Sequence, residues 1–331
     1  MAAPQILYLD NAAVRAAMPP VDKRIELAER TMLALIADAQ LPPKLGVEAR
    51  PAGSFGHAMP AFLRGPSADG SADLLGLKWV VGFPTNGQLG LPAIHATVLL
   101  SDPRTGLPVA LLDGAPITAD RTAAITGVAI RHWAPPLAAR PARVAILGAG
   151  VQARSHLPVV GHLLAGVELT IYDRHPERAE AVAGIARNTP GIAGARTAAT
   201  ARDATIGADV VVTAVSFGPV RQTLVNADLS PDALVVAVDY ATSVHHGVAD
   251  EAGLFLVDEA GQFLANRAAG LFDAYPDPGS TIGAAIRTGR ERPAAGRTLV
   301  THLGVGLADL VFADAIVRAA TAAGRGLALP R

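Results

Sequence analysis

A glycine-rich turn follows an apolar run and opens a helical pattern, which is typical of phosphate binding. The turn reads Gly148-Ala149-Gly150-Val151-Gln152-Ala153 and follows residues 143–147. Gly148 permits a tight turn, Gly150 lets a diphosphate approach the backbone, and Ala153 allows close packing of helix on strand. The first amides and the dipole of that helix favour phosphate. The pattern predicts a dinucleotide site that includes Val151 and Gln152.

An acidic residue follows the next apolar run, near the usual spacing of about 20 residues for a ribose contact. This residue is Asp173, directly after residues 167–172. A carboxylate there binds ribose hydroxyls and repels a 2′-phosphate, which favours NAD. Arg174 would pair with such a phosphate if Asp173 pointed away, so NADP stays an alternative.

Two cationic side chains lie upstream in apolar or small-residue surroundings. They are Lys78, in Gly76-Leu77-Lys78-Trp79, and Arg121, in Thr118-Ala119-Asp120-Arg121-Thr122. Buried cations need partners, so each predicts an internal acid or the carboxylate of a substrate. The residues alone favour the internal ion pair or an exposed head group.

The elements that must position these residues change in type along the chain. The N-terminal part predicts a helix over 21–39, extended segments over 76–81 and 96–100, and a hairpin turn at 102–106. A helix capped by Thr118 or Asp120 then runs to about Trp133. This part reads as a mixed sheet with helices.

Strands alternating with helices follow the prolines at 135, 136 and 141, which predicts parallel βαβ units. The predicted buried strands are 144–147, 169–172, 210–215, 234–238 and 254–257. A chain of 331 residues exceeds the usual limit for one core. We therefore predict an α/β protein with a Rossmann-type domain over 135–302 and a mixed α+β domain over 1–134. An Ala-rich helix at 306–323, within 303–331, is expected to return to that first domain.

The composition limits the classes of protein to which the chain can belong. Half of its residues are hydrophobic and 17% are charged, with a formal net charge of -1 and no cysteine. Disulfides and cysteine metal sites are excluded, and no excess charge marks a nucleic-acid binder. Neither a signal-like N-terminus nor a run of about 18 apolar residues is present. We expect a cytoplasmic protein whose partner is a small molecule, not nucleic acid or membrane.

Several motifs together resemble the ornithine cyclodeaminase/μ-crystallin family, in order and spacing from about residue 40 to residue 310. They are Ala58-Met59-Pro60-Ala61, Gly76-Leu77-Lys78, the segment 102–106, Leu111-Leu112-Asp113, the segment 118–124 and the turn 148–152. The resemblance implies a homodimer in which a substrate-binding and dimerisation domain, completed by the C-terminal helix, faces the Rossmann domain across a cleft.

The same resemblance implies roles for individual residues. Lys78 would lie beside the substrate as a catalytic group, and Arg121 would grip the substrate carboxylate. Lys44, with His57 nearby, would help to hold that carboxylate, and Arg50 competes with Lys44 for this role. The candidate cofactor-side residues are Gly148, Gly150, Val151, Gln152, Asp173, Arg174, Thr213 and Asp239.

Asp239 is the second candidate catalytic residue, because the family's acid after the fifth strand handles the amine or a proton. A strand-end acid that only caps backbone groups is an equal alternative, as is a structural role for Thr213. The chain departs from the family pattern where Ser243 replaces a lysine and Ala93 replaces a cofactor-contacting threonine. These departures leave the reaction open.

We predict no metal site, because the adjacent His245 and His246 should point apart and lack a nearby carboxylate. His57 and His95 are weaker candidates for proton transfer than Lys78. The expected activity is NAD-dependent hydride transfer at Cα of an L-amino acid or cyclic imino acid, ending in cyclodeamination or oxidative deamination. Ketimine reduction, an alanine-type dehydrogenase and a non-catalytic μ-crystallin-like ligand-binding protein are the alternatives.

Overall fold

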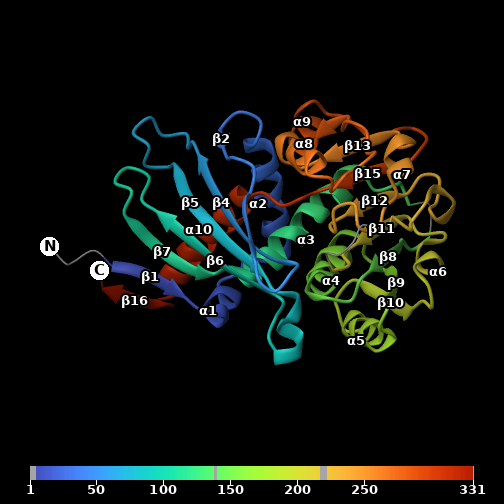
Figure 1. The fold of residues 1–331 in the computed structure, drawn as a ribbon, viewed down its shortest axis with the longest axis horizontal. Helices are drawn as coiled ribbons and strands as arrows, with labels where there is room; N and C mark the ends of the chain where they lie inside the picture. The colour runs from blue at the N-terminus through green and yellow to red at the C-terminus, as the bar shows by residue number, and fades with distance from the viewer. Residues whose placement is uncertain (1–4, 138–139, 217–221, 331) are drawn as a thin grey trace. The chain divides into compact units, whose positions relative to one another are not determined.

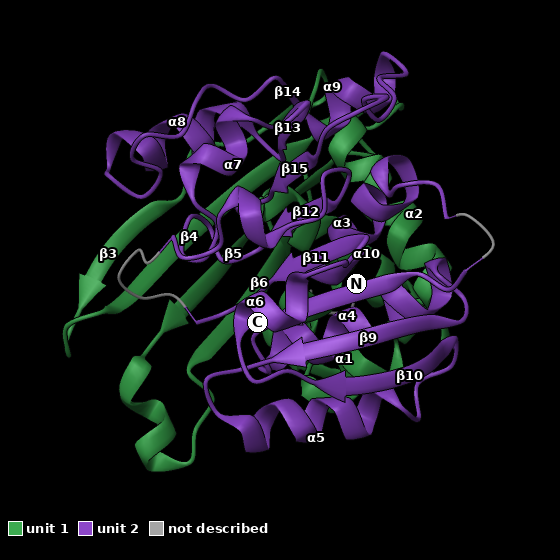
Figure 2. Ribbon diagram, turned by 90° about the vertical axis from the view of Figure 1, so that its right-hand side faces the viewer, with its two compact units in different colours: residues 1–121, 304–331 green, residues 122–303 purple. Residues whose placement is uncertain are grey.

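The chain folds into two compact units in a computed structural model that describes residues 5–137, 140–216 and 222–330. Unit 1 comprises residues 1–121 and 304–331, and unit 2 comprises residues 122–303. Figure 2 colours the two units separately. The division falls inside one helix, not at the proline-rich segment.

Unit 1 is a mixed sheet with helices packed on it (Figure 1). Eight strands of the described residues follow the order β16-β1-β7-β6-β5-β4-β2, with β3 paired to β4. The β1–β7 pairing is parallel and the others are antiparallel. The strands are β1 (Gln5–Leu9), β2 (Ala39–Gln40), β3 (Leu45–Ala49), β4 (Ser54–Leu63), β5 (Leu74–Gly82), β6 (Ile94–Ser101), β7 (Pro108–Asp113) and β16 (Leu327–Pro330).

The returning helix α10 (Gly306–Ala322) packs on this sheet. It contacts β4, β5, β6 and α2, and most of its residues are buried. The helices and the 3-10 turn of this part are α1 (Asn11–Ala16), α2 (Val21–Ala34), η1 (Pro84–Leu89), α3 (Gly114–Trp133, which continues into unit 2) and α10 (Gly306–Ala322). Helix α10 thus belongs to unit 1, together with the N-terminal residues.

Unit 2 is a parallel sheet of the Rossmann type. Its described strands follow the order β10-β9-β8-β11-β12-β15-β13-β14. The strands are β8 (Arg143–Leu147), β9 (Val167–Tyr172), β10 (Ile192–Thr197), β11 (Val210–Thr213), β12 (Leu234–Ala237), β13 (Leu254–Val257), β14 (Ser280–Thr281) and β15 (Thr298–Thr301). The helices are α4 (Val151–Leu163), α5 (Pro176–Ala186), α6 (Ala201–Thr205), η2 (Asn226–Asp228), α7 (His246–Asp250), α8 (Ala260–Ala268) and α9 (Ile282–Arg287).

The carboxyl ends of these parallel strands lie at one edge of the sheet, and the candidate residues of unit 2 follow those ends. Strands β11, β12 and β13 are buried throughout, as their apolar runs predict, and β15 is buried throughout as well. The order reverses between β8 and β11, so the turn after β8 lies at the topological switch point where such sheets bind ligands.

Two expectations about the helices were wrong. The helix from Val21 ends at Ala34 instead of residue 39. Helix α3 begins at Gly114, because the carboxylate of Asp113 at the end of β7 accepts the amide of Ala115 at 2.8 Å. Neither Thr118 nor Asp120 caps it, since both lie within the helix.

The sequence patterns also missed β15, which lies between β12 and β13 although β13 precedes it in the chain. Its residues, Thr298–Thr301, follow a polar loop, and only the two central ones are apolar, so the segment lacks the continuous apolar run that marks a buried strand. No helix of the described residues is both long and apolar enough to cross a membrane.

Candidate functional site

The turn after β8 has the geometry that its glycines predict. Gly148 has a φ of 100°, and a Cβ there would lie 2.4 Å from the carbonyl oxygen of Ala214. Its amide donates to the carbonyl of Tyr172 at 2.7 Å. A side chain at this position would therefore be both strained and in collision with the segment after β11.

Gly150 leaves open space at the start of α4. An added Cβ would meet no heavy atom of the described residues within 4 Å, and no side chain caps the helix there. Val151, the first residue of α4, is 64% exposed, whereas Ala153 is fully buried. The free first amides of α4 thus border a space without side chains, which suits the diphosphate of a dinucleotide.

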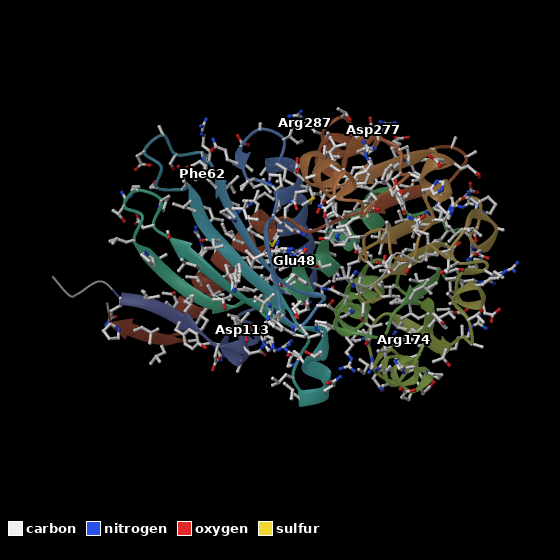
Figure 3. The ribbon with its side chains drawn as sticks, in the orientation of Figure 1. Glu48, Phe62, Asp113, Arg174, Asp277 and Arg287 are labelled. Atoms are coloured by element: carbon white, nitrogen blue, oxygen red, sulfur yellow. The ribbon has the colours of Figure 1, made fainter. Side chains whose placement is uncertain are left out.

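Asp173 follows β9 and faces the glycine-rich turn. Its Oδ2 accepts the amide of Ala149 at 2.8 Å, and its Oδ1 accepts the amide of His175 at 2.9 Å. Each carboxylate oxygen keeps a second lone pair for a ribose hydroxyl. The neighbouring Arg174 is exposed on the segment before α5 (Figure 3). The carboxylate therefore holds the turn and remains available to a ribose.

Asp239 is buried and receives hydrogen bonds from three neighbours. Thr213, at the end of β11, donates to Oδ1 at 2.7 Å, and Ser243 donates to Oδ2 at 2.6 Å. The amide of Val215 lies 3.4 Å from Oδ2. Burial raises the pKa of Asp239, and the bonds from Ser243 and Thr213 act in the opposite direction. Thr213 and Ser243 thus belong to one internal polar cluster centred on this carboxylate.

The segment after Asp239 turns sharply at Tyr240. Tyr240 has a φ of 60°, uncommon for a bulky residue. Its hydroxyl lies 3.3 Å from the carbonyl of Leu303, and its ring stacks on Phe272 at 5.9 Å. Ser243 stands where the family pattern has a lysine and hydrogen-bonds to the acid instead of adding a charge.

Lys78 and Arg121 share one buried acid, Asp309. The Nζ of Lys78 lies 2.7 Å from Oδ2 of Asp309, and the Nε of Arg121 lies 3.2 Å from its Oδ1. Lys78 is 1% exposed, Arg121 5% and Asp309 0%. The hydroxyl of Thr118 lies 3.5 Å from the same Nζ. The three charged residues come from β5, α3 and α10, all within unit 1.

Sequence reasoning missed Asp309, although it anticipated that an internal acid would neutralise the two cations. The residue lies in the first turn of α10, in the otherwise apolar stretch Gly306-Leu307-Ala308-Asp309-Leu310. A lone carboxylate on the apolar face of a buried helix needs a buried cation. That signal would have marked Asp309 as the partner of a buried cation, but spacing along the chain does not say which cation it pairs with.

Two glycines let α10 approach these cations. A Cβ on Gly304, whose φ is 81°, would lie 2.6 Å from both Nη atoms of Arg121. A Cβ on Gly306 would lie 2.4 Å from the carbonyl oxygen of Met59 in β4. These two glycines, at and just before the start of α10, thus allow the position from which Asp309 reaches both cations.

The cluster changes the protonation of its members. Burial lowers the pKa of Lys78 to about 7, with Arg121 adding to the effect and Asp309 opposing it. Burial also disfavours ionised Asp309, but Arg121 and Lys78 outweigh it and hold the pKa of that carboxyl below its usual range. Lys78 can therefore gain or lose a proton near neutral pH while Asp309 stays charged.

Of the two candidate upstream cations, Lys44 is the better placed. Its charge acts on both His57 and Lys78, whereas Arg50 is exposed in the turn after β3. Burial, followed by the charges of Lys44 and Lys78, lowers the pKa of His57 to about 4. His57 stacks on Phe55 at 4.6 Å and is neutral at physiological pH. It suits hydrogen bonding better than acid catalysis.

The reasoning applied to His245 and His246 was wrong in two respects. Their rings do not point apart, since the centroids are 4.1 Å apart, and Asp250 lies 3.1 Å from Nδ1 of His246. The Nδ1 of His245 instead accepts the amide of Gly247 at the start of α7. Within the described residues, no three such ligands are grouped to hold a metal ion.

The depressed pKa of Lys78 predicts that stability rises with pH. The folded chain releases the proton near pH 7, whereas the ordinary pKa of 10.5 applies after unfolding. Between these values the unfolded chain binds the extra proton, so the free energy of unfolding increases by at most ~1.4 kcal/mol per pH unit. Lys78→Met removes this titration. Urea denaturation between about pH 7 and about pH 10 should show a steeper rise for the wild type than for Lys78→Met.

The exposed Lys23, paired with Glu26 on α2, supplies the control. Lys23→Met should keep the wild-type slope of stability against pH, because an exposed lysine is not desolvated on folding. Equal slopes for the wild type and Lys78→Met would contradict a depressed pKa of Lys78.

Curated relatives match part of the chain. Nodulation efficiency protein NfeD of Rhizobium meliloti is 34% identical over 175 residues, 53% of this chain and 51% of that protein. Ketimine reductase mu-crystallin of Mus musculus is 33% identical over 148 residues, 45% of each chain. The chain thus spans about half the length of the curated relatives it matches.

Solved structures match nearly the whole chain. A Thermococcus litoralis Δ1-pyrroline-2-carboxylate reductase in complex with NADH and L-proline is 25% identical, with a TM-score of 0.84 over 97% of this chain and 99% of that one. An archaeal alanine dehydrogenase dimer with bound NAD is 23% identical, with a TM-score of 0.83 over 98% and 99%. These matches agree with a Rossmann-type domain. The model described as the ornithine cyclodeaminase/mu-crystallin family matches residues 16–242, and the chain therefore belongs to that family.

Proposed function

We propose that this protein uses NAD(H) to transfer hydride at the Cα of an L-amino acid or a cyclic imino acid, with reduction of the imine or oxidation of the amine as the outcome. The observation that carries the proposal is the buried cluster of Lys78, Arg121 and Asp309, whose charges do not balance. With Lys78 protonated, two positive charges face one negative charge. One anionic group, such as a substrate carboxylate, would neutralise the remainder.

Arg121 is the group that would hold this carboxylate. Its Nε is engaged by Asp309, and a planar guanidinium presents further donors that match a carboxylate. Holding the carboxylate orients the Cα hydrogen, an effect that depends on position and not on reactivity. Lys44, whose charge acts on Lys78 and His57, would add to the attraction.

Lys78 is the proposed catalytic acid and base. Because its pKa is about 7, its Nζ can donate a proton to an amine or accept one from it near neutral pH. Asp309 keeps that Nζ in place at 2.7 Å. A carboxylate bound beside Lys78 would favour its protonated form, so substrate binding and proton uptake would be coupled.

The turn of Gly148 and Gly150, the first amides of α4 and Asp173 would hold the dinucleotide. NAD supplies hydride chemistry when bound, and the protein supplies orientation and charge. The NADH of the pyrroline-2-carboxylate reductase, a solved relative of the same fold, supports this cofactor. Arg174 would pair with the 2′-phosphate of NADP if Asp173 pointed away, so NADP is the alternative cofactor.

The burial and the hydrogen bonds of Asp239 favour imine reduction or amine oxidation over cyclodeamination. Cyclodeamination needs a group to manage a second amine, and the altered segment offers Ser243 where the family pattern has a lysine. Both oxygens of Asp239 accept internal hydrogen bonds, and the side chain is 1% exposed. We therefore assign Asp239 to holding Thr213 and Ser243, as an acid that orients the end of β11.

Turnover with a panel of substrates tests the proposal. NADH consumption with cyclic imino acids identifies a reductase, net NADH formation with L-amino acids identifies a dehydrogenase, and ammonia release without net NADH identifies a cyclodeaminase. Binding of NADH with none of these reactions would favour a ligand-binding protein and contradict the enzymatic proposal.

Lys78→Ala should lower kcat by about a hundredfold or more, as expected for loss of a general acid–base, and leave NADH affinity unchanged. The exposed Lys23→Ala is the control and should keep the wild-type kcat. Turnover retained in Lys78→Ala would give Lys78 a structural role only.

Asp173→Ser should change cofactor preference. Loss of the carboxylate should lower the affinity for NAD by about tenfold, since it removes a charged hydrogen bond to the ribose. The affinity for NADP should not fall for this reason. The ratio of the two affinities is the readout, because the loss of the bond to Ala149 affects both cofactors equally. Glu177→Ser, in the exposed first turn of α5, is the control. An unchanged ratio in Asp173→Ser would contradict the ribose assignment.

We also propose that the protein forms a homodimer through one face of the unit 1 sheet. This outer face includes Leu45, Val47 and Trp79, which are 58%, 59% and 41% exposed. Pairing of Leu45 and Trp79 with opposite sides of Ala58 places them on the same face. Exposed apolar side chains in a group mark an interface. The archaeal alanine dehydrogenase of the same fold is a dimer.

Sedimentation velocity tests the dimer. The wild type should have about twice the chain mass of 33.8 kDa, and Trp79→Glu should shift it to the monomer because a charge on the outer face opposes its burial. Ile206→Glu, at an apolar side chain of unit 2 that is 58% exposed, should remain dimeric. A wild-type monomer at micromolar concentration would contradict the proposal.

A further inference from the structure

Two buried histidines in unit 2 are joined through one threonine hydroxyl. The Nε2 of His156 in α4 lies 2.9 Å from Oγ1 of Thr126 in α3, and Nε2 of His302, just after β15, lies 3.0 Å from the same oxygen. His156 and Thr126 are 0% exposed and His302 is 2% exposed. The proposed reaction uses none of these side chains.

The hydrogen-bonded series of His302, Thr126 and His156 extends to the glycine-rich turn. The Nδ1 of His156 lies 2.6 Å from the carbonyl oxygen of Gln152, the fifth residue of the glycine-rich turn. A carbonyl only accepts, so Nδ1 carries a proton. Burial lowers the pKa of His156 to about 4, and the neutral ring therefore has an acceptor at Nε2.

The direction of the remaining bonds follows from that proton. Thr126 has one hydroxyl hydrogen, which it donates to Nε2 of His156. Its oxygen is then the acceptor for His302, whose Nε2 must carry a proton. The series of hydrogen bonds therefore runs from His302 through Thr126 and His156 to the carbonyl of Gln152, and each side chain donates one of them.

A proline gives this chain a task. Pro158 lies inside α4 and has no amide hydrogen, so the carbonyl of Arg154 loses its helical partner. The N-terminal part of α4, which presents its first amides to the proposed diphosphate, is thereby less firmly joined to the rest of the helix. The His156 side chain attaches this part to α3 and to the end of β15 instead.

We propose that His156 is a positioning residue that holds the first turn of α4 in place for the dinucleotide diphosphate, acting through Thr126 and His302. The inference rests on the proposed use of NAD(H). It adds a set of side chains that never touch the cofactor and yet determine its affinity.

Titration of NADH and of ADP-ribose, which lacks nicotinamide, tests the inference on the full chain. Thr126→Val keeps the shape of the side chain but removes the hydroxyl that joins His156 to His302. It should lower the affinity for both ligands by about fivefold to tenfold, the effect of one lost hydrogen bond. Thr126→Ser retains the hydroxyl and should restore wild-type affinity. His156→Gln, which removes the bond to Gln152, should weaken both ligands like Thr126→Val.

A buried threonine elsewhere in unit 2 controls for general loss of stability. Thr205 is 0% exposed and donates to the carbonyl of Asp228 at 2.9 Å, so Thr205→Val should lower the melting temperature without changing either dissociation constant. Wild-type affinity in both Thr126→Val and His156→Gln would overturn the inference. If the wild type itself failed to bind NADH, the proposed function would fail first, and the inference with it.

Discussion

The pairing of Asp309 with Lys78 and Arg121 is the interaction on which the proposed substrate site depends. Two cations in a dry interior are costly unless an anion compensates them, and one carboxylate compensates only one. In the proposed function, the remaining positive charge is what would attract the carboxylate of the substrate. The same burial brings the pKa of Lys78 to about 7, so one arrangement supports both recognition and proton transfer.

The cofactor side depends on backbone geometry instead of charge. Parallel strands deliver the turn of Gly148, the acid Asp173 and the polar pair of Thr213 and Asp239 to one edge of the sheet. Glycine matters at two positions for opposite reasons: Gly148 avoids a collision, whereas Gly150 leaves a space open. Asp173 then connects the two neighbouring strand ends by accepting the amide of Ala149.

Two groups of buried polar side chains in unit 2 hydrogen-bond among themselves. Asp239 accepts hydrogen bonds from Thr213 and Ser243. His156 accepts one from Thr126, whose hydroxyl oxygen accepts one from His302. Such satisfied networks fix side chains in one arrangement, because each donor that loses its partner in the interior costs free energy. The acid first considered as a reacting group is better understood as the centre of such a network.

The sequence by itself determined the Rossmann-type domain, the glycine-rich turn and the family, because these features rest on local spacing along the chain. It also indicated that Lys78 and Arg121 needed a buried partner. Only the tertiary structure identified that partner as Asp309, which is brought from α10 to β5 and α3 by a long-range chain return. The place of β15 between β12 and β13, and the internal bonds of Asp239, were likewise decided by contacts between distant segments. Spacing along a chain encodes local geometry, whereas charge pairing between remote elements depends on how they pack.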